Sequence, residues 1–143
     1  MDRVRAARRD DAPALAKLLD QLGYPADEAL IQRRLAEHLD HGDARLLVAE
    51  GDDGQALGFI SLHVIPQLAL EGGFCRISYL CVDASARGRG IGERLVQAAE
   101  VYARARGCDR MELHCDWRRE AAQRFYARLG YLEAPRYWRH PLK

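Results

Sequence analysis

The fold of this chain is decided by the stretch Val82-Asp83-Ala84-Ser85-Ala86-Arg87-Gly88-Arg89-Gly90-Ile91-Gly92-Glu93. The segment before it, Phe74–Val82, has the composition of a long strand. After it, apolar residues from Ile91 to Tyr102 recur at helical spacing, and Gly107 ends the predicted helix. The stretch is therefore the turn at which a strand passes into a long amphipathic helix.

Upstream of this turn the pattern predicts a strand, two helices and a hairpin. Asp10 or Asp11 caps a helix that ends at Gly23, and Asp27 caps a second helix that Gly42 closes. A glycine-rich turn at 51–54 joins two strands into an antiparallel hairpin. The predicted strands of this half are Arg3–Ala7, Arg45–Glu50 and Ala56–Leu68.

Downstream, the chain predicts a strand, a helix stopped by Gly130 and a final strand, namely Arg110–Cys115, Glu120–Leu129 and Tyr131–His140. The element order is β-α-α-β-β-β-α-β-α-β. The sequence shows no internal repeats and no linker between these elements. We therefore predict a single α/β domain over residues 1–143, with a mixed, mostly antiparallel sheet flanked by helices.

Composition limits the classes of function. The 143 residues are 48% hydrophobic and 30% charged, with a net charge of +1, which is typical of a soluble domain and argues against nucleic-acid binding. The charged N-terminus has no signal-peptide pattern and no apolar run is long enough to cross a membrane, so we expect a cytoplasmic protein without membrane contact. The four cysteines and five histidines form no ligand spacing, so no metal is predicted.

Charge is distributed unevenly between the two halves. Residues 1–72 contain 8 Lys/Arg and 13 Asp/Glu, a net of −5, whereas residues 73–143 contain 14 and 8, a net of +6. This asymmetry fits two ligands of opposite charge, an anion held by the second half and a cation near the first. Solvated faces can produce the same asymmetry.

The glycine-rich turn has the features of an anion site. Gly88, Gly90 and Gly92 let the backbone turn tightly and bring its N–H groups close to a ligand. The positive end of the following helix favours phosphate, and Arg87 and Arg89 add permanent charge. Neither a P-loop nor a dinucleotide-binding spacing is present. The alternative is a flexible basic turn that only caps the helix.

Two motifs resemble those of the GNAT (Gcn5-related) N-acetyltransferases. Arg87-x-x-Gly90-x-Gly92 after the strand ending at Asp83 is similar to the family's acetyl-coenzyme A signature. Downstream, Ala122-x-x-Phe125-Tyr126-x-x-x-Gly130-Tyr131 resembles its second motif. The resemblance covers essentially the whole chain and implies acetyl transfer from acetyl-coenzyme A to an amine through a tetrahedral intermediate.

The resemblance implies a set of cofactor-binding residues. The pyrophosphate of acetyl-coenzyme A would lie on the turn, and its pantetheine arm would pair with the backbone of the preceding strand, which carries a bulge in the family. Tyr126 matches the tyrosine proposed to protonate the leaving thiolate. The expected cofactor-binding residues are Leu80, Cys81, Val82, Arg87, Gly88, Arg89, Gly90, Ile91, Gly92 and Arg119.

The chain also departs from the family pattern. Related enzymes often have Glu where this chain has Tyr79, so the group that takes a proton from the amine is open. Glu112 is our first candidate, and Glu71, His114 and Asp116 are alternatives that could act through water. Arg119 stands near the position of a frequent Asn, and Gln123 stands where some relatives have His.

The acceptor is expected to be a small-molecule amine. Tyr24, Tyr79 and Trp138 could form an aromatic wall suited to a cation, although such residues are more often ordinary packing residues. Amino acids, polyamines, aminoglycosides, a protein N-terminus or a lysine all remain open, and the chain is compatible with a homodimer. A coenzyme A-binding regulator without turnover is the alternative function.

Overall fold

The computed structural model describes residues 2–134 and 137–143, which form two compact units, Met1–Glu112 and Leu113–Lys143. The first unit begins with strand β1 (Arg3–Ala6), 3₁₀-helix η1 (Arg9–Asp11) and helices α1 (Ala12–Leu22) and α2 (Glu28–Asp40). Strands β2 (Ala44–Glu50), β3 (Ala56–Ile65) and β4 (Phe74–Val82), 3₁₀-helix η2 (Ala84–Ala86) and helix α3 (Ile91–Ala105) follow. Strand β5 (Arg110–Leu113) contains the boundary between the two units in the sequence.

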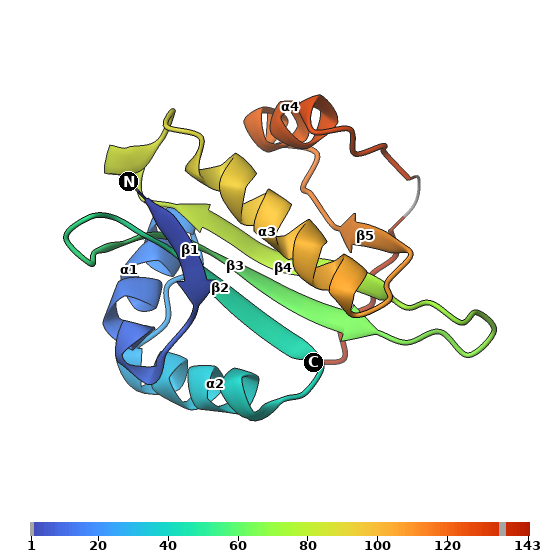
Figure 1. Cartoon of the computed structure of the whole chain (residues 1–143), viewed down its shortest axis with the longest axis horizontal. Coiled ribbons are helices and arrows are strands. Elements are labelled where there is room, and N and C mark those ends of the chain that lie inside the picture. The colour runs from blue at the N-terminus through green and yellow to red at the C-terminus, as the bar shows by residue number, and fades with distance from the viewer. Residues whose placement is uncertain (1, 135–136) are drawn as a thin grey trace. The chain divides into compact units, whose positions relative to one another are not determined.

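The strands form one sheet in the order β1-β2-β3-β4-β5, and the first four are antiparallel neighbours (Figure 1). Phe59 and Cys81 are buried in one cluster with residues of α1 and α2. A Cβ added to the neighbouring Gly58 would lie 3.3 Å from Leu95 of α3. Because successive residues of a strand point to opposite faces, α1 and α2 cover one face of the sheet and α3 covers the other.

Strand β4 contains a bulge at Ser78. Ile77 is paired with Leu62 and Tyr79 with Ser61, so Ser78 is one residue more than the partner strand β3 provides. Leu62 lies on the α3 face and Ser61 on the opposite face, which α1 and α2 cover. Ile77 and Tyr79 therefore point to opposite faces although they are two residues apart. The Ser78 hydroxyl lies 3.2 Å from Nδ1 of His63.

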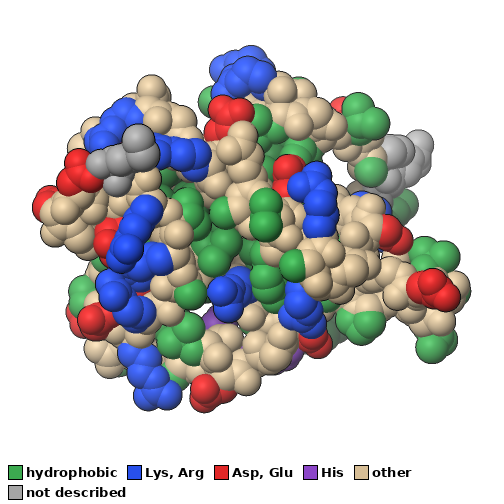
Figure 2. Space-filling view, in the orientation of Figure 1, with side chains coloured by type: hydrophobic (Ala, Val, Ile, Leu, Met, Phe, Trp, Pro, Cys, Tyr) green, Lys and Arg blue, Asp and Glu red, His purple; other side chains and the backbone are tan. Residues whose placement is uncertain are grey.

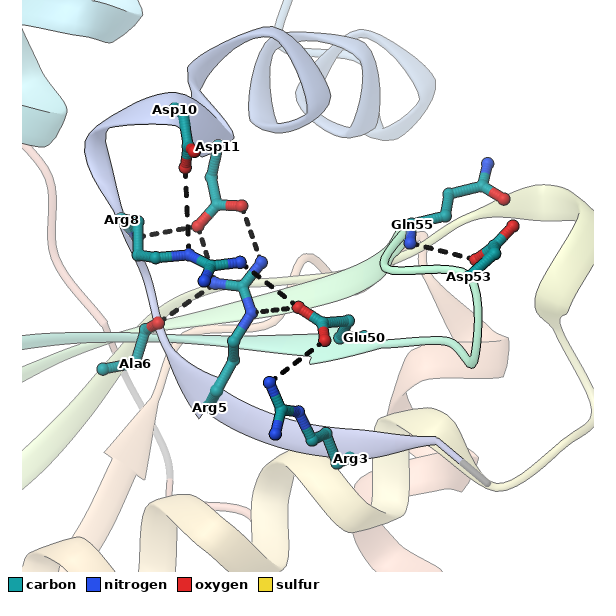
Figure 3. A network of polar contacts seen from close by, with 9 residues as sticks. All are labelled: Arg3, Arg5, Ala6, Arg8, Asp10, Asp11, Glu50, Asp53 and Gln55. Atoms are coloured by element: carbon teal, nitrogen blue, oxygen red, sulfur yellow. Dashed lines mark hydrogen bonds and ion pairs between the residues drawn. The ribbon is translucent and has the colours of Figure 1, made fainter.

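An ion-pair network fastens the N-terminal strand to the rest of the first unit (Figure 3). The Arg5 guanidinium binds both carboxylate oxygens of Asp11, at 2.8 and 2.9 Å, and also the carboxylate of Glu50. The Asp11 carboxylate additionally accepts a hydrogen bond from the Arg8 backbone N–H at 2.7 Å. Asp11 precedes α1 as predicted, but its side chain does not cap the helix because Arg5 and Arg8 occupy it.

Several predicted boundaries need correction. Strand β3 ends at Ile65 and not at Leu68, because Pro66 cannot donate a ladder hydrogen bond. Helix α2 ends at Asp40, before Gly42, with His41 as its C-cap. The predicted final strand is absent from the described residues 131–134 and 137–143, where Pro141 also lacks an N–H for pairing. Pro135 and Arg136 lie outside the described residues.

The second unit contains helix α4 (Glu120–Arg128), followed by an extended chain without regular secondary structure in its described residues. Gly130 follows α4 with a φ of 91°, which agrees with its predicted role as the stop. Within the described residues no helix is long and apolar enough to cross a membrane. Positive and negative side chains are mixed on the part of the surface around β1 and α1 (Figure 2), as expected for a net charge of +1.

Candidate active site

The turn between β4 and α3 is anchored by Asp83. Its buried carboxylate accepts hydrogen bonds from the backbone N–H and the hydroxyl of Ser85, at 2.9 and 2.8 Å. These bonds lower the pKa of the Asp83 carboxyl, so it remains ionised at neutral pH. Gln21 of α1 accepts a hydrogen bond from the Ala84 N–H at 3.0 Å. The turn is thus fixed to the first helix as well as to the sheet.

Glycine is required in the turn by backbone conformation. Gly88 and Gly90 have φ values of +78° and +77°, in the left-handed region that side chains disfavour. A Cβ at either position would meet no atom within 4 Å among the described residues. The surroundings of both glycines are therefore open, and it is their conformation that shapes the turn.

The first turn of α3 has the character of an anion site. Gly90 is the N-cap, and no side chain in the described part of the chain caps the helix. The N–H groups of the first turn consequently have no acceptor within the helix, and the helix dipole adds partial positive charge there. Arg87 and Arg89 are exposed beside this end, and Arg89 lies 3.4 Å from the Asp2 carboxylate.

The end of β4 reaches beyond β5. The Asp109 N–H donates to the Gly73 carbonyl at 2.9 Å, so β5 begins beside the start of β4. Strand β5 has four residues and β4 has nine. At about 3.3 Å per residue, β5 is too short to accompany the Leu80–Val82 segment. The predicted cofactor-binding backbone therefore lies where β4 extends past its neighbour.

Glu112, the predicted proton acceptor, lies on β5 in an ion pair. Its Oε2 accepts a hydrogen bond from Nε of Arg110 at 2.7 Å. Arg110 also binds Asp109 and Gln67, which holds its guanidinium in place. The Arg110 contact engages one of the two carboxylate oxygens of Glu112, and its role as a base stays a prediction.

Three predicted site residues lie in the second unit. Tyr126 is half-buried on α4, with ring centroids 5.0 Å from Phe125 and 5.5 Å from Tyr131. Arg119 is the N-cap residue of α4, and its backbone N–H donates to the Asp116 carbonyl at 2.9 Å. Trp138 is 83% exposed. The roles of all three stay predictions.

A cavity of about 590 Å³ lies between α1, α2 and the sheet, and we call it the α1–α2 cavity. Its volume falls within the range of roughly 300–1,000 Å³ that is usual for small-molecule sites. Leucine and isoleucine side chains of both helices, with Leu46 and Phe59 of the sheet, form most of its described lining. All of the described lining belongs to the first unit.

Two of the three predicted acceptor-binding residues meet at this cavity. Tyr24 follows α1 and Tyr79 lies on β4, and their rings pack edge to face with centroids 5.7 Å apart. Both are partly exposed, at 51% and 39%. The bulge at Ser78 is what turns Tyr79 toward this face. Tyr79 thus faces the α1–α2 cavity.

Sequence reasoning missed three polar residues of the cavity, namely Arg34, His38 and Ser61. His38 belongs to no metal-ligand pattern, so ligand spacing alone assigns it no role. Its position, with Ile31 and Leu35, on the apolar face of α2 was the signal that could have identified it. Nδ1 of His38 is buried and has no hydrogen-bond partner among the described residues. Burial is the main cause that lowers the pKa of His38, and electrostatic interaction with His63 and His41 lowers it further.

Comparison with known proteins identifies similar sequences. A family model described as Acetyltransferase (GNAT) family matches residues 7–131, which span both compact units. The chain is 34% identical over 118 residues to aminoglycoside N(6′)-acetyltransferase type 1 of Klebsiella aerogenes, a match covering 78% of each protein. It is 44% identical over 121 residues to glucosamine 6-phosphate N-acetyltransferase 1 of Oryza sativa, covering 81% of this chain and 72% of the relative.

A solved structure shows the same fold. A transcriptional regulator from Bacillus halodurans C-125 superposes with a TM-score of 0.90 and covers 99% of this chain and 100% of its own. The two sequences are 23% identical, so this similarity concerns the fold alone.

Proposed function

Because this chain belongs to the acetyltransferase (GNAT) family and is an acyl-coenzyme A-dependent N-acetyltransferase, we propose that it acetylates a primary amine of a small molecule. One observation carries the proposal. The turn from Arg87 to Gly92 presents an uncapped helix N-terminus, shaped by a left-handed glycine, directly after a bulged strand. Similarity to enzymes that acetylate an aminoglycoside and glucosamine 6-phosphate supports an amine acceptor.

The residues of the turn fit the pyrophosphate of acetyl-coenzyme A. In the proposal, backbone N–H groups of Arg87–Gly92 bind the phosphates, and Arg87 and Arg89 contribute positive charge. Acetyl-coenzyme A supplies the activated thioester. A backbone N–H of the Leu80–Val82 segment donates to the acetyl oxygen and stabilises the charge of the tetrahedral intermediate, an effect worth roughly 3 kcal/mol.

The amine acceptor occupies the α1–α2 cavity in this proposal. Tyr24 and Tyr79 support this assignment because they combine an exposed aromatic surface with a position beside the β4 bulge. The amine must be neutral when it attacks, since an ammonium ion has no lone pair. After attack, Tyr126 protonates the departing thiolate, as the family resemblance implies.

A matched pair of glycine variants tests the phosphate cradle. Gly90→Val places a β-branched side chain at a φ of +77° and should displace the N–H groups of the turn. We expect coenzyme A affinity, measured by equilibrium dialysis, to fall at least about tenfold. Gly54→Val is the control, because Gly54 has a φ of +82° and equally open surroundings in the β2–β3 turn. Unchanged affinity in Gly90→Val would contradict the proposal.

A measurement of turnover distinguishes an acetyltransferase from a non-catalytic coenzyme A-binding protein. Release of free thiol from acetyl-coenzyme A should depend on an added amine, and acetylated amine should appear in equal amount. A well-folded protein that binds coenzyme A but acetylates no amine of a broad panel would instead be a non-catalytic coenzyme A-binding protein.

A further inference from the structure

The side chains that line the α1–α2 cavity indicate which class of amine the cavity accepts. We propose that the cavity selects an amine with an apolar body and a single positive charge, and that it disfavours polycations. This inference rests on the proposed function, because it specifies the acceptor of the same reaction. Such an acceptor would distinguish this chain from the aminoglycoside N(6′)-acetyltransferase to which the chain is similar.

The apolar lining favours an apolar body. Leu30 and Ile31 of α2, and Leu46 and Phe59 of the sheet, line the cavity, and the last three of these are buried. Contact with such side chains removes apolar surface of the ligand from water, which favours binding in proportion to the area buried. A sugar ring with several hydroxyl and amino groups would lose more hydration there than the few polar side chains of the lining, such as His38 and Ser61, could replace with hydrogen bonds, which is costly.

The charges of the lining oppose a second ammonium group. No carboxylate occurs among the described residues that line the cavity, whereas Arg34 brings a permanent positive charge. Glu37 pairs with Arg34 at 2.9 Å, but both side chains are more than 60% exposed, so the pair is weak and screened by solvent. His38 contributes no charge at pH 7, because its pKa lies below the ordinary 6.5 and the ring is neutral.

One cation is nevertheless accommodated at the cavity. The Tyr24 and Tyr79 rings meet at the lining, and aromatic faces attract an ammonium group. This places the reacting nitrogen beside Tyr79, next to the β4 bulge, and directs the remainder of the molecule toward the apolar side chains. A second ammonium group at the far end of the molecule would lie among apolar side chains near Arg34.

Two amines of equal chain length test the proposal. Hexylamine and hexamethylenediamine differ only in the second amino group. We expect kcat/KM for hexylamine, measured by thiol release from acetyl-coenzyme A with the full-length protein, to exceed that for the diamine at least about tenfold. Binding of each amine alone, measured by isothermal titration calorimetry, should follow the same order and does not require acetyl-coenzyme A.

Charge reversal on α2 provides matched variants. Arg34→Glu reverses the charged side chain of the lining and should shift the preference toward the diamine about tenfold. Arg33→Glu makes the same change in net charge at the adjacent exposed position, which does not line the cavity, and should leave the preference unchanged. Both side chains are exposed, so both variants should fold, as circular dichroism would verify.

The experimental outcomes distinguish a failure of this inference from a failure of the proposed function. Equal or better binding and acetylation of the diamine or of an aminoglycoside would overturn the inference and leave the acetyltransferase intact. Equal shifts in Arg33→Glu and Arg34→Glu would also overturn it, because the effect would then not come from the cavity. Absence of coenzyme A uptake would overturn the proposed function, whereas the calorimetric comparison of the two amines would still decide the inference.

Discussion

Tyr126 is the residue on which the proposed proton transfer to the thiolate depends. Tyr126→Phe removes the hydroxyl and retains the ring that packs against Phe125 and Tyr131. We expect kcat to fall about 100-fold, because a positioned general acid typically contributes a factor of this order. Coenzyme A affinity should stay nearly unchanged, which dialysis can verify. The control is Tyr102→Phe on α3, which removes a hydroxyl that accepts a hydrogen bond from Arg106, the C-cap residue of that helix. A full rate in Tyr126→Phe would show that the assignment is wrong.

His38 makes the stability of the protein depend on pH. Burial lowers its pKa below the ordinary 6.5, so below about pH 6.5 the unfolded chain binds more protons at this residue than the folded chain. Stability should therefore decrease as the pH falls below 6.5, by at most about 1.4 kcal/mol per pH unit for this residue. Urea unfolding of His38→Gln between pH 7.5 and 5.5 should show a smaller loss than the unmodified protein. The exposed His140→Gln is the control, and an equal loss in all three proteins would exclude His38 as the cause.

At the scale of elements, the Arg5 network joins β1, η1 and β2. Arg5→Ala would leave the carboxylate of Asp11, which is 6% exposed, without its main partner. Breaking a buried ion pair from one side costs several kcal/mol, so we expect the free energy of unfolding to fall by about 3 kcal/mol in urea titrations. Arg9→Ala, at an exposed position of η1, should change it by less than about 0.5 kcal/mol. A similar loss in both variants would contradict the special role of Arg5.

Elements with local signals were predictable from the sequence. Asp27 caps α2 through a 2.7 Å hydrogen bond to the Leu30 N–H, and Gly90 opens α3, as expected. The partner of Asp11 was not predictable, because Arg5 and Glu50 reach it only after β1 has paired with β2. The final strand was predicted from composition alone, and strand pairing depends on a neighbour that composition does not reveal.

For the whole molecule, the uneven charge distribution should make the two substrates respond differently to salt. Coenzyme A is polyanionic and, in our proposal, binds the net-positive half of the sequence, whereas an apolar amine gains mainly from burial. Raising sodium chloride from about 0.05 to about 0.5 M should weaken coenzyme A binding about fivefold and change hexylamine binding little. Calorimetry on both ligands measures this difference, and Arg89→Ala should reduce the salt dependence of coenzyme A. Equal salt dependence of coenzyme A binding and hexylamine binding would contradict the assignment of coenzyme A to the net-positive half of the sequence.

The candidate site was only partly predictable at this scale. The glycine turn was visible because positive φ angles require a particular residue type. The α1–α2 cavity was not, because Arg34 on α2 and Ser61 on β3 become neighbours of Tyr79 only through tertiary packing. The sequence predicts Tyr24, Tyr79 and Trp138 as one aromatic wall, but it gives no information on the charge of their surroundings.

The extra residue in β4 also bears on how the chain can change its chemistry. It reverses the odd-even order of inward and outward side chains, so that position 79 faces the α1–α2 cavity whichever amino acid stands there. Deleting Ser78 would remove the bulge but leave Tyr79 as the partner of Ser61, on the same face of the sheet. A change at position 79 between a carboxylate and an aromatic ring therefore alters the lining of the α1–α2 cavity without rebuilding the strand.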